Sequence, residues 1–175
     1  MSESSDAVLF QKSILFDTNV LIELTEKSSA FEDFFRILER QKCNFVTFPF
    51  VRFEFLDLAS REELRAPKEA LMEKLNMISL PSSPGLLLEK LVVSALQISH
   101  IYQRHKRKSP GLVDCVLTAL LQQYPNDLLL VTRNHCDFPV LLLDRVFVTS
   151  IDVGGDVLAI AFYRFNAEKA KECGL

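Results

Sequence analysis

Short apolar runs alternate along this chain with longer amphipathic segments, and this alternation constrains the fold more than any other feature of the sequence. Nearly continuous apolar strands are typical of a parallel sheet that helices cover on both faces. The sequence therefore predicts an α/β fold, a three-layer α/β/α sandwich around a central parallel sheet of about five strands. The strand-like runs are 13–16 (SILF), 44–48 (NFVTF), 76–80 (NMISL), 128–132 (LLLVT) and 146–150 (VFVTS).

Helical spacing of apolar residues predicts the elements between these strands. Pro49 suits the first turn of the helix that follows the second strand. Residues 1–12 show no such pattern and are expected to form a flexible N-terminal arm, whereas residues 13–175 are expected to form a single domain. The expected helices cover 19–27, 30–41, 49–58, 61–74, 86–106 and 113–124, with a last helix after Gly155.

The composition narrows the classes of protein further. The chain has 175 residues, of which 49% are hydrophobic and 25% charged, as in an ordinary globular domain. Its net charge of −3 means that binding to a nucleic acid would need a local positive patch. No apolar run approaches the ~20 residues of a membrane span, and the N-terminus lacks the features of a signal peptide. We therefore expect a cytoplasmic protein without membrane contact.

Four cysteines are scattered along the chain without any CxxC pair, so neither a disulfide framework nor a zinc site is expected. Buried, reduced thiols are the expected state of Cys43, Cys115, Cys136 and Cys173.

Four acidic residues fall where the carboxyl ends of the strands are expected. Asp17 follows the first strand, and Asp137 lies just beyond the fourth. Glu54 lies about one turn into the helix after the second strand, and Asp114 stands at the start of a later helix. Open parallel sheets bind ligands at this edge. Crowded carboxylates repel one another unless a divalent cation lies between them, and ligation by oxygen alone favours Mg²⁺ or Mn²⁺.

Each acid taken alone also fits a structural role. Asp17 and Asp114 suit helix caps. Asp137 suits a loop turn, and Glu54 suits a solvated helix position. Their joint placement favours a site, together with nearby short polar side chains that can orient carboxylates or a metal-bound water. These supporting residues are Asn19, Thr132 and Asn134.

A basic run ends the long helix that precedes Asp114. It contains Arg104, Lys106, Arg107 and Lys108. The cluster predicts contact with the phosphates of a nucleic acid, although cations at a helix end also suit the negative pole of the helix dipole. Further arginines that can extend a positive rim are Arg52, Arg61, Arg65, Arg133 and Arg145.

Four segments together resemble the PIN-domain family of ribonucleases. Segment 14–22 (ILFDTNVLI) is similar to the family's opening signature, in which an apolar strand runs into Asp-Thr-Asn. Segment 46–55 resembles its second strand and acidic helix, and 111–120 resembles its third acidic motif. Segment 129–138 resembles the fourth, where Thr-x-Asn precedes the last acid. The segments follow the family's order, and the resemblance is closest to prokaryotic toxin-type members, the VapC-like ribonucleases.

This resemblance implies a metal-dependent endoribonuclease that uses Mg²⁺ or Mn²⁺ to hydrolyse RNA, acts as the toxin of a toxin–antitoxin pair, forms a homodimer and is controlled by an antitoxin protein. It also implies the roles of the acids. Asp17, Glu54 and Asp114 correspond to the core acids, and Asp137 to a fourth. Thr132 and Asn134 match supporting polar positions. The tail after residue 152 exceeds the length of the smallest family members.

Other classes of protein fit the sequence in part. A housekeeping PIN nuclease in RNA processing would carry the same acids, whereas a non-catalytic PIN-like scaffold that binds RNA or protein would not need them. A haloacid-dehalogenase-like phosphatase also places an aspartate after an apolar strand. That chemistry needs a second aspartate where this chain has Asn19. A receiver-like domain would need a lysine directly after the fifth strand, and none lies at that place.

Overall fold

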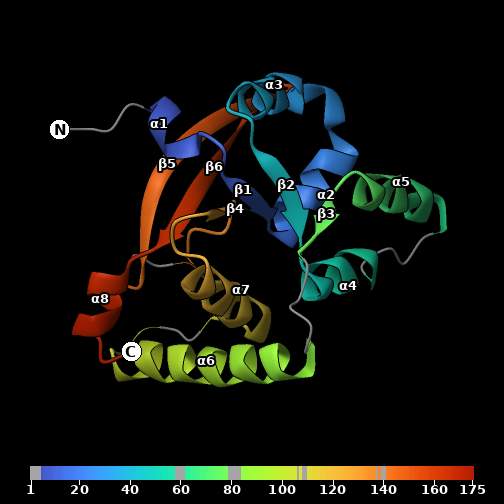
Figure 1. Cartoon of the computed structure of the whole chain (residues 1–175). Helices are drawn as coiled ribbons and strands as arrows, with labels where there is room; N and C mark the ends of the chain where they lie inside the picture. The colour runs from blue at the N-terminus through green and yellow to red at the C-terminus, as the bar shows by residue number, and fades with distance from the viewer. Residues whose placement is uncertain are drawn as a thin grey trace.

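The chain folds as a mixed α/β protein around one six-stranded sheet with the strand order β3-β2-β1-β4-β6-β5 (Figure 1). This result confirms the α/β class. The computed structural model describes residues 5–57, 62–78, 84–105, 107, 110–136, 138 and 141–175.

One half of the sheet is parallel. Strand β1 (Ser13–Phe16) pairs in parallel with β2 (Asn44–Thr47) on one side and with β4 (Leu128–Thr132) on the other. The short strand β3 (Asn76–Met77) adds to β2, also in parallel. Because these four strands point the same way, their carboxyl ends meet at one edge of the sheet.

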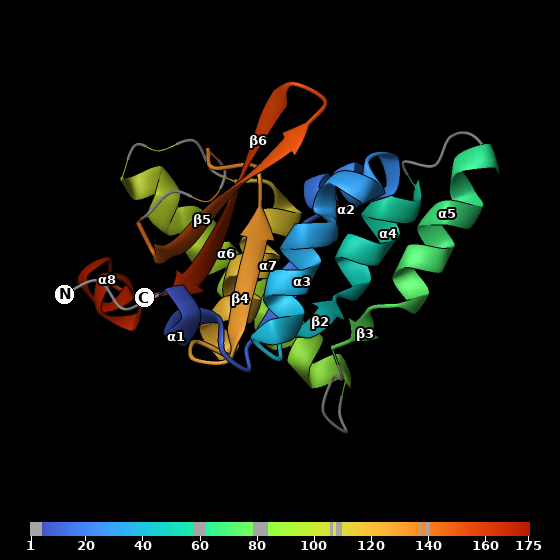
Figure 2. The same cartoon turned by 90° about the horizontal axis from the view of Figure 1, so that it is seen from above.

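The other half is antiparallel, and here the sequence-based prediction of an all-parallel sheet with about five strands is wrong. Strands β5 (Leu143–Val153) and β6 (Asp156–Phe165) form a hairpin, and β6 pairs antiparallel with β4. Thr132 at the end of β4 lies opposite Ala161, so the earlier part of β6 extends past the end of β4. Figure 2 shows this hairpin projecting beyond the rest of the sheet.

The hairpin also corrects the helix that was predicted from Gly155 onward. Gly154 and Gly155 connect the two strands and have φ angles of +64° and +103°, which suit a tight hairpin turn. The residues that follow are mostly aliphatic and aromatic, and Leu158, Ile160 and Phe162 are buried. Only a short helix, α8 (Ala167–Glu172), follows β6.

Helices cover both faces of the sheet. Helix α3 lies on one face, and α7 lies on the other between the sheet and α6 (Figures 1 and 2). Helix α6 buries Leu91, Ala95, Ile98 and Tyr102, whose spacing forms one helical face. Besides α8, the helices are α1 (Ser5–Leu9), α2 (Thr18–Glu26), the 3-10 turn η1 (Ser28–Phe31), α3 (Glu32–Arg40), α4 (Pro49–Asp57), α5 (Glu62–Glu73), α6 (Pro84–Arg104) and α7 (Leu112–Gln123).

The N-terminal segment differs from the flexible arm that the sequence predicts over residues 1–12. Residues 5–9 form α1, and Leu9 is buried in the core. The backbone N–H of Gln11 donates to the carbonyl of Gln41, which ties this segment to the end of α3. A helix with one buried residue, Leu9, therefore lies in a segment that shows no amphipathic period. Residues 1–4 lie outside the described part of the chain.

Among the helices that the structure describes, none is both long enough and apolar enough to cross a lipid bilayer.

The hairpin turn makes a testable contribution to stability. Gly155 has a φ of +103°, a conformation that side-chain-bearing residues rarely adopt, whereas the φ of +64° at Gly154 is one that asparagine tolerates. We expect Gly155→Asn to lower the free energy of unfolding by about 1–3 kcal/mol. Gly154→Asn, the matched control, should lower it by less. Urea denaturation measures both changes, and equal effects would contradict this account of the turn.

Candidate carboxylate site

Asp17 is placed by the end of β1 and the start of α2. Its backbone N–H donates to the carbonyl of Val131 on β4 at 3.0 Å, so the pairing of the two strands continues to this residue. Asp17 as a whole is only 5% exposed, and Oδ1 of its carboxylate accepts a hydrogen bond of 2.7 Å from the backbone N–H of Thr18. Asp17 therefore caps α2, as the sequence allows, but this contact occupies only one of its two oxygens.

The second oxygen of Asp17 faces two of the supporting residues expected from the sequence. Oδ2 accepts hydrogen bonds from the Thr132 hydroxyl and from Asn19 Nδ2, both at 2.6 Å. Asn19 Nδ2 also lies 3.1 Å from Thr132 Oγ1, so the three side chains form one network. Thr132 is fully buried at the end of β4. Asn134 joins the network through its backbone N–H, which donates to Thr132 Oγ1 at 2.9 Å.

Thr18 links Asp17 to a second acid. Its hydroxyl donates to Oε2 of Glu54, which is half-buried in the second turn of α4. The same residue thus holds Asp17 with its backbone and Glu54 with its side chain. Thr18 is not among the candidate residues that the sequence suggests, although it is the central residue of the Asp-Thr-Asn segment.

The environment of Asp17 disfavours its negative charge. Burial raises the pKa of its carboxyl above the ordinary value of 3.8, and the nearby charge of Glu54 raises it further. The hydrogen bonds from Thr132, Thr18 and Asn19 lower the pKa, but they do not cancel the effect of burial. A cation beside these two carboxylates would favour their ionised forms, and their oxygens are ligands suited to Mg²⁺ or Mn²⁺. The donor chemistry of this pair therefore fits a hard divalent cation.

Asp114 lies in the first turn of α7 and makes a different contact. Helix α7 leads through a short turn into β4, so the two elements run in opposite directions and the start of α7 lies near the end of β4. The Asp114 carboxylate accepts a hydrogen bond of 3.0 Å from the backbone N–H of Gly111. The N-cap of α7 is therefore Gly111, and Asp114, the third residue of the helix, binds the N–H of that cap instead of being the N-cap that the sequence allowed.

The structure thus joins Asp17 and Glu54 through Thr18. Within the described ranges, no three His, Cys, Asp or Glu side chains are grouped in a way that could hold a metal ion. Asp137, the fourth acid expected from the sequence, lies outside the described residues.

The basic run is described only in part. Arg104 is the last residue of α6, and its guanidinium donates to the carbonyl of Cys173 at 3.0 Å, beyond the end of α8. Arg107 is exposed. Lys106 and Lys108 fall among the residues that are not described.

All four cysteines are free in the structure. Of the four, Cys115 is buried and Cys136 is exposed, so the expectation that all are buried is wrong. Burial raises the pKa of the Cys115 thiol to about 11, which keeps this thiol protonated at neutral pH.

The chain matches no protein-family model and no curated protein sequence. Its fold is similar to that of a chain in a solved toxin–antitoxin complex from Klebsiella pneumoniae. The two chains share 22% sequence identity with a TM-score of 0.50, over 71% of this chain and 89% of that one. At this identity the similarity establishes a shared fold. The protein is thus an α/β protein with two carboxylates, Asp17 and Glu54, that Thr18 links at the carboxyl edge of the parallel strands.

The raised pKa of Asp17 predicts a pH dependence of stability. Between pH 3.8 and the pKa in the folded state, the folded protein keeps a proton on Asp17 that the unfolded chain has lost. The free energy of unfolding should therefore fall as the pH rises through this window, whereas below pH 3.8 this contribution is fully present. We expect the fall to be smaller in Asp17→Asn, which has no proton to lose.

Urea unfolding of both proteins from below pH 3.8 to neutral pH measures this difference. Asp33→Asn is the matched control because Asp33 is an exposed acid on α3. Parallel stability curves for the wild type and Asp17→Asn would contradict the prediction.

Proposed function

We propose that this protein is a metal-dependent endoribonuclease that hydrolyses RNA, and that it acts as the toxin of a toxin–antitoxin pair. The observation that carries the proposal is the buried Asp17 carboxylate, which is oriented by Thr132 and Asn19 and coupled to Glu54 through Thr18. This pair lies at the edge where open parallel sheets bind ligands. The fold shared with a chain of a toxin–antitoxin complex is consistent with the toxin role.

Asp17, Glu54 and Asp114 are the residues that we propose to hold Mg²⁺ or Mn²⁺, with Asp137 as a fourth acid. Such an ion would supply Lewis acidity towards the scissile phosphate and would lower the pKa of an attacking water molecule. The protein's own contribution is orientation. Hydrogen bonds from Thr132 and Asn19 orient the Asp17 carboxylate, and the hydrogen bond from the Thr18 hydroxyl holds Glu54 beside it.

Direct attack by water also agrees with the state of the Cys115 thiol. The Cys115 thiol is buried and protonated at neutral pH, so it is a poor nucleophile. The chemistry that we propose has no covalent intermediate on the protein.

We further propose an antitoxin protein as the regulatory partner and a homodimer as the active assembly. The name of the Klebsiella pneumoniae complex includes both a toxin and an antitoxin, which supports a protein partner.

The acids provide the direct test. We expect Asp17→Asn and Asp114→Asn to abolish RNA cleavage in Mg²⁺ or Mn²⁺ while the fold persists, and a chelator to abolish wild-type cleavage. Thr132→Val should reduce cleavage about 10- to 100-fold, because it removes a hydrogen bond that orients a proposed ligand. Cleavage of structured and unstructured RNA measures these effects, and circular dichroism checks the fold.

Asp33→Asn again serves as the control and should cleave at the wild-type rate. Cleavage at this rate by Asp17→Asn would exclude the proposed site. RNA binding without metal-dependent cleavage by the wild type would instead favour a non-catalytic RNA-binding scaffold.

The basic run provides a second test. Reversing the charges of Arg104, Lys106, Arg107 and Lys108 should weaken RNA binding and flatten its salt dependence, by about 0.7 in logarithmic slope for each lost contact with single-stranded RNA. A variant that keeps Arg104 separates this effect from the contact between Arg104 and Cys173. Reversal of Arg36 and Arg40 on α3 is the control. Unchanged binding would exclude the basic run as an RNA contact.

A further inference from the structure

Beside the carboxylate pair lies a second charged cluster, formed by Glu23, Lys27 and Arg133. Glu23 is buried on α2, and its Oε1 accepts a hydrogen bond from the guanidinium of Arg133. Its Oε2 forms an ion pair of 2.9 Å with Lys27, one turn further along the helix. The side chains of Arg133 and Lys27 remain 35% and 36% exposed. The acid of this cluster is therefore buried, whereas its two cations reach solvent.

Arg133 is fixed to α2 at two points. Its backbone N–H donates to Oδ1 of Asn19 at 3.0 Å, and its guanidinium binds Glu23. Asn19 and Glu23 are four residues apart, so they lie on one face of α2. Arg133 also directly follows Thr132, whose hydroxyl binds Asp17. The groups that orient Asp17 thus also determine where Arg133 lies.

The net charge of this cluster is opposite in sign to that of the carboxylate pair beside it. Two cations and one carboxylate leave a net charge of +1 next to the acidic pair of Asp17 and Glu54. A guanidinium has five N–H donors, and a single hydrogen bond to Glu23 leaves others available on the exposed side. The planar fork of these donors matches the oxygens of a phosphate.

We propose that Arg133 binds a backbone phosphate of the RNA substrate and that Glu23 is a positioning residue that holds the guanidinium at this edge. The proposal deepens the proposed nuclease function and rests on it. Lys27 adds positive charge beside the same phosphate. Burial of the Glu23 carboxylate is costly on its own, and its two ion pairs offset that cost while they restrict Arg133 to one place.

The test is the steady-state cleavage of a single-stranded RNA by Arg133→Gln, Arg133→Lys and Glu23→Gln. For Arg133→Gln and Glu23→Gln we expect KM to rise about tenfold, the size of one charge-assisted hydrogen bond, with kcat changed by less than about twofold. Arg133→Lys should recover part of the loss, because it restores the charge without the fork.

Glu23→Gln distinguishes a role in positioning Arg133 from attraction of RNA by net charge alone. This change raises the net charge of the cluster from +1 to +2, so attraction by charge alone would lower KM. A positioning role predicts the opposite. A thermal unfolding midpoint for each variant shows whether the fold is retained, and Arg133→Gln tests the phosphate contact even if Glu23→Gln fails to fold.

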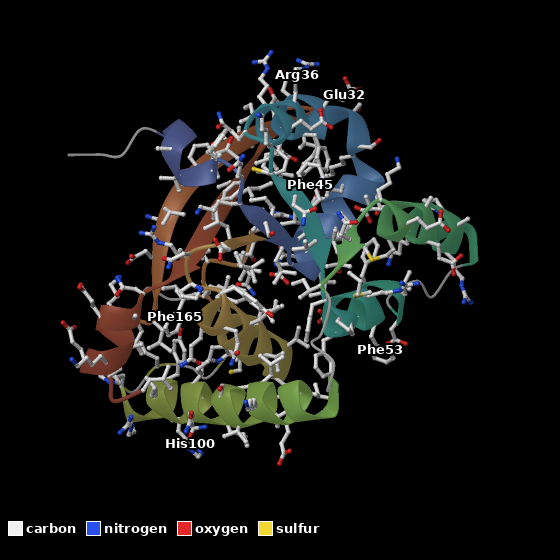
Figure 3. The ribbon with its side chains drawn as sticks, in the orientation of Figure 1. Glu32, Arg36, Phe45, Phe53, His100 and Phe165 are labelled. Carbon is white, nitrogen blue, oxygen red and sulfur yellow. The ribbon has the colours of Figure 1, made fainter. Side chains whose placement is uncertain are left out.

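Arg36→Gln and Asp33→Asn are the matched controls, because these residues form an exposed ion pair on α3, where Arg36 points away from the body of the protein (Figure 3). Both should leave KM unchanged. An unchanged KM in Arg133→Gln would overturn the inference while the nuclease function stands.

Fluorescence anisotropy of labelled RNA, measured with a chelator present, separates the two proposals further. Binding that Arg133→Gln weakens, in a protein that does not cleave, would support the phosphate contact and overturn the nuclease function. The absence of both binding and cleavage in the wild type would overturn both.

Discussion

The buried carboxylate of Asp17 is the constraint on which the arrangement of this region depends. A carboxylate with so little solvent contact is costly unless hydrogen-bond donors surround it. The donors here come from the Thr18 backbone, the Asn19 side chain and the Thr132 hydroxyl. Thr132 lies 115 residues away from Asp17 in the sequence, so this compensation exists only when β1 and β4 pair in the observed register.

Strand β4 is a rigid support for this network. It pairs in parallel with β1 and antiparallel with β6, and all five of its residues are buried. A strand that is held on both sides fixes the position of the side chain at its end, which is a requirement for any site that must orient a ligand. The C-terminal hairpin thus contributes to the site, although none of the proposed functional residues comes from it.

Residues 17–19 and 132–134 form a continuous chain of contacts along the edge. Thr18 extends it to Glu54 on α4, and Asn19 extends it to Arg133. Glu23 then connects Arg133 to Lys27. Negative and positive groups therefore lie next to one another on a few short segments. Such an edge can offer oxygen ligands to a cation and nitrogen donors to a phosphate.

The sequence by itself determined the α/β class, strands 13–16 and 128–132, and the candidate positions Asp17, Asn19 and Thr132, because apolar runs and the polar residues that end them are local properties. Only the tertiary structure decided the antiparallel hairpin, the link from Thr18 to Glu54 and the pairing of Glu23 with Arg133. The pattern of residues after Gly155 is compatible with a helix or a strand. These residues form the strand β6 because they pair with β4. The period of apolar residues indicates which side chains are buried. Which other side chain a residue contacts depends on the path of the whole chain.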